Sequence, residues 1–120
     1  MAGYRIHRVS EDIKREIISI IKYIKDPRVQ GKMLTVIRVD VSGDLSYAKV
    51  YVSDLQGIKS AKDAVLGLES ASGYIRRELG RSISIKKTPE LKFIADDSIE
   101  HGMEISKKIK DTMGDNVDDN

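Results

Sequence analysis

The sequence lacks several residue types on which small proteins rely for covalent cross-links and catalysis. It contains no cysteine, no tryptophan and only two histidines, His7 and His101. Without cysteine the chain forms no disulfide and offers no thiolate to a metal or substrate. Neither histidine has zinc ligands, or a serine nucleophile, at a recognised spacing. We therefore expect no metal centre, no cofactor and no catalytic site.

Aromatic residues and long apolar runs are also scarce. One phenylalanine and five tyrosines are present, and only Tyr47, Tyr51 and Phe93 fall on predicted strands, which disfavours a sheet that stacks RNA bases. No apolar run approaches the roughly 18 residues of a membrane span, and residues 1–10 lack the apolar centre of a signal peptide. There is no phosphate-binding glycine motif of the Walker or Rossmann kind. We expect a cytoplasmic protein with no membrane partner and no small-molecule substrate.

The length of 120 residues suits one domain with one core. We expect a single domain over residues 1–113. Residues 114–120 are polar and acidic, with too little apolar surface to order themselves, so they predict a disordered acidic tail.

Positive charge is concentrated in two segments although the net charge is only +2. Residues 1–38 hold nine Lys or Arg against four Asp or Glu, and residues 71–92 hold six against two. The last ten residues hold four aspartates and no basic residue, which masks the basic body in the total. Clustered positive charge suggests a polyanionic partner, while a solvated charged surface is the plain alternative.

Apolar residues at intervals of three and four predict a long first helix. The apolar stripe comprises Ile6, Val9, Ile13, Ile17, Ile20, Ile21 and Ile24. Asp26 before Pro27 predicts the end of this helix, because a residue before proline disfavours helical conformation. Arg8, Arg15 and Lys22 fall opposite the stripe and form a basic ridge about 21 Å long.

Alternating β-branched residues predict a hairpin, with strands at residues 34–42 and 45–53 joined by a turn at Ser42, Gly43 and Asp44. A second helical stripe follows from Ser60, a plausible cap, to Gly80, a plausible terminator. Residues 81–88 look extended, and residues 91–95 predict a third strand.

The small residues Ala71, Ser72 and Gly73 fall in the middle of the second predicted helix, although the apolar stripe keeps its phase through them. A glycine inside a helix costs roughly 1 kcal/mol relative to alanine, so it indicates either a kink or close approach by another backbone. Arg76 and Arg77 follow one turn later, which suggests that a phosphate chain approaches there. Tight packing against another helix is the alternative.

Residues 99–113 predict a last helix, which Asp96, Asp97 and Ser98 would cap. The same region suggests a rival function, because Asp96, Asp97, Glu100 and His101 could surround a metal in a small α+β enzyme or metabolite-binding module. We interpret these side chains instead as a helix cap and a surface pair.

At this level of detail the sequence resembles the ribosome-binding factor A family. The matching segments are Arg8-Val9, residues 26–28, the hairpin from Val39 to Val52, residues 71–79, residues 89–93 and residues 96–98. In this order they span nearly all of residues 5–109.

The resemblance implies an α+β fold of the type II KH-like kind, with a three-stranded sheet and helices on one face. It also implies that a helix-kink-helix at Ala71-Ser72-Gly73 replaces the usual GxxG loop. The expected function is a non-catalytic, monomeric assembly factor that binds the 30S ribosomal subunit and 16S rRNA and assists late 16S rRNA maturation, often in the cold. The residues expected to contact RNA are Arg5, Arg8, Arg15, Lys22, Ala71, Ser72, Gly73, Arg76, Arg77, Arg81, Lys86 and Lys87. The short acidic tail departs from the family pattern, so we expect no contact between the tail and RNA.

Overall fold

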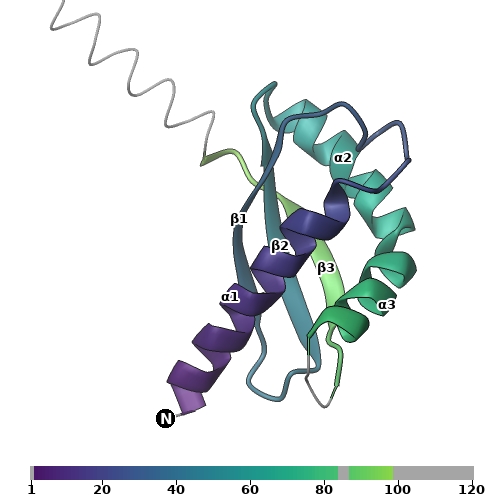
Figure 1. Cartoon of the computed structure of the whole chain (residues 1–120). Coiled ribbons are helices and arrows are strands. Elements are labelled where there is room, and N and C mark those ends of the chain that lie inside the picture. The colour runs from purple at the N-terminus through teal and green to yellow at the C-terminus, as the bar shows by residue number, and fades with distance from the viewer. Residues whose placement is uncertain (1, 84–86, 99–120) are drawn as a thin grey trace, which may run out of the picture.

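A mixed three-stranded sheet covered on one face by helices forms the protein (Figure 1). The computed structural model describes residues 2–83 and 87–98, with side chains from Ile6 onward, so the predicted last helix and acidic tail lie outside the described residues. Within that range the elements are α1 (Ala2–Ile21), β1 (Leu34–Val41), β2 (Tyr47–Asp54), α2 (Ile58–Ser70), α3 (Ser72–Ser82) and β3 (Glu90–Ala95). The predicted α+β class is confirmed.

The sheet has the order β1-β2-β3, with β1 antiparallel to β2 and β3 parallel to β2. Two parallel strands need a crossover connection, and α2 and α3 supply it. All three helices lie on the same face of the sheet, with α3 following α2 end to end and α1 packed beside α3 (Figure 1). One core fills the space between the layers, built on Ile13 and Ile17 of α1, Val50 of β2 and Leu68 of α2, all 0% exposed.

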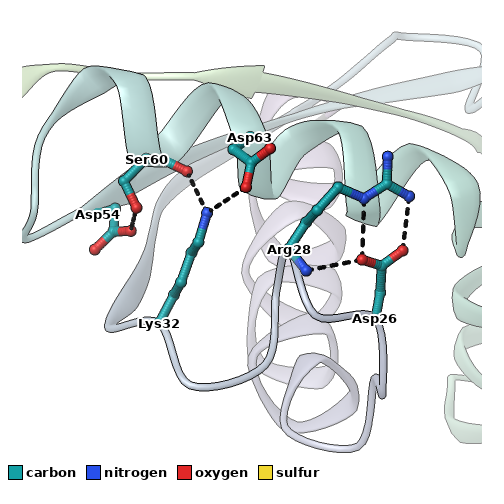
Figure 2. A network of polar contacts seen from close by, with 6 residues as sticks. All are labelled: Asp26, Arg28, Lys32, Asp54, Ser60 and Asp63. Atoms are coloured by element: carbon teal, nitrogen blue, oxygen red, sulfur yellow. Dashed lines mark hydrogen bonds and ion pairs between the residues drawn. The ribbon is translucent and has the colours of Figure 1, made fainter.

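Several predicted boundaries were wrong by a few residues. Helix α1 ends at Ile21 rather than near Asp26, although Ile24 is still buried in the turn that follows. The apolar stripe therefore extends past the end of the helix, because the turn after it is also buried. Helix α2 begins after Gly57 rather than at a Ser60 cap, because the Ser60 hydroxyl instead donates to the buried Asp54 carboxylate (Figure 2).

The hairpin turn is longer than predicted, and the predicted helix terminator was wrong. The turn includes the predicted Ser42, Gly43 and Asp44, because the Leu45 N–H donates to the Ser42 carbonyl at 2.9 Å. It continues through Leu45, which has a positive φ, and β2 starts only at Tyr47. The Ser42 hydroxyl accepts hydrogen bonds from the backbone N–H groups of Ser46 and Tyr47, both at 3.1 Å, which fixes this longer turn. Gly80 lies inside α3, which continues to Ser82.

The loop between α1 and β1 lies directly against helix α2. A Cβ added to Gly67 would lie 2.7 Å from Val29 Cγ2 and 3.2 Å from both Arg28 Cβ and Asp26 Oδ1. The loop therefore reaches the helix backbone, and glycine is needed at this contact. Gly73 is different, because a Cβ added there would meet nothing within 4 Å among the described residues.

Ion pairs fix the same loop at two points (Figure 2). Arg28 donates from Nε to Asp26 Oδ1 at 3.0 Å, from Nη2 to Asp26 Oδ2 at 2.7 Å and from its backbone N to Oδ1 at 2.8 Å. Further along, Lys32 Nζ donates to the Ser60 carbonyl at 3.0 Å and to Asp63 Oδ2 at 2.9 Å. The hydrogen bonds from Arg28 lower the pKa of Asp26 to about 2 from an ordinary value of 3.8.

The contrast between two helical glycines gives a test of this packing. Gly67→Ala should destabilise the fold by about 1–3 kcal/mol, because overpacking displaces side chains or backbone. Gly73→Ala should leave the stability unchanged or raise it by up to about 1 kcal/mol, because alanine has the better helix propensity and open space around it. Urea unfolding of the two variants beside the wild type measures both changes. Equal effects at the two positions would contradict the close approach at Gly67.

The Asp26–Arg28 pair should make stability depend on pH with a definite sign. A carboxyl with a lowered pKa in the folded state contributes its full stabilisation above its unfolded value near 3.8, and that contribution is lost as the pH falls towards 2. Asp26→Asn should therefore destabilise the protein at pH 7, and the difference from wild type should narrow between about pH 4 and pH 2. Thermal unfolding across that range measures it.

An Arg28→Gln background supplies the control for the pH experiment. There Asp26 has lost its partner, so Asp26→Asn should cause a smaller change in stability with a flatter pH dependence. The same pH profile in both backgrounds would assign the effect to another group.

Candidate nucleic-acid interface

The outer face of α1 carries the predicted basic ridge. Arg8, Arg15 and Lys22 are all exposed. Arg8 and Arg15 lie two turns apart on α1, about 10 Å along its axis. Lys22 directly follows Ile21, the last residue of the helix, and continues the ridge into the turn. Arg15 lies 3.4 Å from Asp12, but its side chain is 74% exposed. A surface pair of this kind contributes little, so Arg15 remains available to a phosphate.

Helix α3 presents a second set of basic side chains beside the first. Arg77 is exposed, and its side chain forms no hydrogen bond or ion pair with another described residue. Arg81 is exposed as well and lies 3.4 Å from Glu78. Because α1 packs against α3 on the same face of the sheet (Figure 1), these arginines and the α1 ridge together form what we call the basic face.

Arg76 has a structural role that the sequence did not indicate. Its Nε donates to the Pro89 carbonyl at 3.1 Å, and its Nη2 donates to the Thr88 carbonyl at 3.0 Å. These bonds tie α3 to the segment that enters β3. The hypothesis that Arg76 also contacts RNA stays a prediction, and its substitution will affect the fold as well as any binding.

The structure divides the long second helix at one residue. Helix α2 ends at Ser70 and α3 begins at Ser72, while Ala71 between them has φ −94° and ψ 6°. The hydrogen-bond ladder passes through this point, because the Ala71 N–H donates to the carbonyls of Gly67 and Leu68 at 3.1 Å. The break thus lies at the first residue of the predicted Ala71-Ser72-Gly73 motif.

The side chains at the break differ in exposure. Ala71 and Ser72 are half-buried and Gly73 is exposed. Since Gly73 meets nothing that a Cβ would disturb, the surface beside it is open to a backbone from outside. Helix packing within the described chain does not account for this glycine.

The loop–helix contact positions this break. Arg28 Nη2, which holds Asp26, also donates to Ser70 Oγ at 3.2 Å. The loop that follows α1 is therefore bonded to the last residue of α2. Sequence reasoning missed this arrangement, and Asp26-Pro27-Arg28 was its only local signal, since an aspartate followed by arginine two residues later can close such a loop.

Three predicted positions have little or no support from the described residues. The side chains of Arg5 and Lys86 lie outside the described residues. Lys87 is described and exposed, but it follows the gap at 84–86, so we do not place it on the basic face.

The rival metal site receives no support. Asp96 uses Oδ1 to accept hydrogen bonds from the backbone N–H of Ser98, at 2.8 Å, and from the Ser98 hydroxyl. These bonds lower the pKa of Asp96, because hydrogen bonds to a carboxylate favour its charged form. Across residues 2–83 and 87–98 no group of three potential metal ligands comes together, while Glu100 and His101 lie outside the described residues.

Among the described helices, none has both the length and the apolar character needed to span a membrane.

Comparison with known proteins agrees with the resemblance seen in the sequence. A protein of Clostridium tetani named ribosome-binding factor A is 48% identical over 119 residues, covering 98% of this chain and 97% of that protein. The crystal structure of ribosome-binding factor A from Thermus thermophilus is 27% identical, with a TM-score of 0.66 over 75% of this chain and 93% of that chain.

A second similar structure comes from a complex. It is a homology model of the Thermus thermophilus factor fitted into the cryo-EM map of a 30S–RbfA complex, 28% identical with a TM-score of 0.57 over 69% of this chain and 86% of that one. The family model for ribosome-binding factor A matches residues 5–109. The chain therefore belongs to the ribosome-binding factor A family.

Proposed function

We propose that this protein is a non-catalytic assembly factor that binds the 30S ribosomal subunit through 16S rRNA and assists late 16S rRNA processing. The basic face carries this proposal, because two neighbouring helices present exposed cations on one side of the molecule. Membership of the family and the 30S complex of a similar structure support it. The protein would act as a cytoplasmic monomer, with a particular role in the cold.

The proposed mode of binding is electrostatic. Lysine and arginine neutralise phosphates and release counterions, so binding should weaken strongly as salt rises and should depend little on base sequence. The α1 ridge would follow one stretch of backbone while Arg77 and Arg81 contact another. Specificity would then come from the shape of the RNA.

The open surface at Gly73 would give a sugar-phosphate chain room to approach α3. We propose that the break at Ala71 serves here in place of the GxxG loop of a KH domain, within a single type II KH-like domain over residues 1–113. The acidic segment 114–120 would stay outside the interface, because its charge repels phosphate.

Arg77→Ala should weaken binding to small ribosomal subunits without harming the fold. Removing an exposed, unpaired arginine should change the free energy of unfolding by no more than about 0.5 kcal/mol. Losing one phosphate contact should reduce the slope of log K against log salt by about 1. Co-sedimentation with 30S subunits across a salt series, beside urea unfolding, measures both quantities. Absence of binding by the wild type at low salt would contradict the proposed function.

Two further variants act as controls. Lys92→Ala removes the same charge from the opposite face of the sheet, where Lys92 is exposed between the buried Leu91 and Phe93, and it should leave binding unchanged. Arg76→Ala should lower stability by about 1–2 kcal/mol through the lost bonds to Thr88 and Pro89. If Lys92→Ala weakens binding to 30S subunits as much as Arg77→Ala does, the interface is not the basic face.

A further inference from the structure

An open hollow of about 410 Å³ lies beside the break between α2 and α3. It brings together the end of α1, the start of the following loop and both sides of the break. Its lining includes Tyr23, Lys25, Asp26, Ser70, Ala71 and Tyr74. The volume is within the range of small-ligand sites.

Two exposed tyrosines from distant parts of the sequence line this hollow. Tyr23 is 72% exposed and Tyr74 is 41% exposed. Each is followed by a buried isoleucine, Ile24 at 5% and Ile75 at 0% exposure. These anchors fix the backbone on both sides of the hollow while leaving the aromatic rings at the surface. A single exposed tyrosine is ordinary, but two at one hollow form a platform.

The electrostatics of the hollow favour an anionic chain passing its edge. Asp26 brings a negative charge to the lining, but its carboxylate is held by Nε and Nη2 of Arg28 at 3.0 and 2.7 Å. Lys25 adds an exposed positive charge. On the chain, Lys22 of the basic face directly precedes Tyr23, and Arg77 lies one turn beyond Tyr74.

We propose that the Tyr23–Tyr74 hollow binds an unstacked RNA base, while Lys22, Lys25 and Arg77 contact the flanking phosphates. This inference rests on the proposed function and adds a site for one nucleotide to a face otherwise described by charge. Aromatic side chains bind single-stranded bases by stacking, which is tolerant of sequence. The site would therefore recognise an unpaired nucleotide rather than a particular base.

The test uses an oligouridine RNA of about eight nucleotides and the same RNA with abasic positions as probes, at fixed salt. Tyr23→Ala and Tyr74→Ala should each weaken binding of the uridine RNA about ten- to hundred-fold, the usual effect of losing one stacking partner. The wild type should bind the abasic RNA more weakly than the uridine RNA. The two variants should bind the abasic RNA as tightly as the wild type does. The salt dependence should not change, because no cation is lost.

Three matched variants separate stacking from folding. Tyr47→Ala removes another exposed tyrosine, 46% exposed at the start of β2 and outside the hollow, and should leave binding unchanged. Tyr74→Leu keeps apolar volume without an aromatic face and should weaken binding as Tyr74→Ala does, while Tyr74→Phe should retain it. Circular dichroism and thermal unfolding establish that each variant is folded.

The outcomes distinguish this inference from the function on which it rests. If the wild type binds neither the RNA nor 30S subunits, the proposed function fails. If the wild type binds but Tyr23→Ala and Tyr74→Ala match Tyr47→Ala, the hollow is not a base site and the proposed function stands. If the two variants lose binding to 30S subunits but not to the oligonucleotide, the hollow takes a ribosomal protein and the inference is overturned.

Discussion

The contact between the loop after α1 and the backbone of α2 is the constraint on which the rest of the arrangement depends. Val29 reaches so close to Gly67 that a methyl group would not fit between them. The Asp26–Arg28 pair and the Lys32–Asp63 pair hold the loop on either side of Val29 (Figure 2). Because Arg28 also bonds Ser70, the end of α1 is fixed beside the break at Ala71. This contact therefore holds together the end of α1, the break and the residues that line the tyrosine hollow.

Much of the fold could be predicted from the sequence, because each strand and helix has a period set by burial. The hairpin followed from the alternation of β-branched residues, and residues 91–95 were predicted as the third strand. Two consecutive apolar residues in β1, Val36 and Ile37, did not reveal that the register with β2 shifts there. The apolar stripe of the second helix kept its phase through Ala71, so periodicity gave no sign of the division into α2 and α3. A single residue in the bridge conformation, Ala71, divides the helix without changing which side chains are buried.

The candidate site was predictable only in part, since charges on one helix face can be read from spacing whereas tertiary partners cannot. The exposure of Arg8, Arg15, Lys22 and Arg77 followed from their positions opposite the apolar stripes. Arg76 could not be separated from Arg77 in this way, because its partners are backbone carbonyls that any sequence at Thr88 and Pro89 would offer. The tyrosine hollow was missed for a related reason. Tyr23 and Tyr74 line one hollow only because the chain folds there, and nothing local to either residue predicts the other.

The helical glycines differ in whether packing within the protein explains them. A glycine in a helix costs roughly 1 kcal/mol relative to alanine. At Gly67 that cost is offset by loop packing that no larger residue permits, and at Gly80 an added Cβ would lie 3.0 Å from Thr88 Oγ1. At Gly73 no described residue is close enough to explain the choice. A destabilising residue with no packing role inside the described chain suggests a role outside it, and Gly73 lies on α3 one residue before Tyr74 and four before Arg77. This fits the proposed function, in which an RNA backbone would occupy the space that a side chain at Gly73 would take.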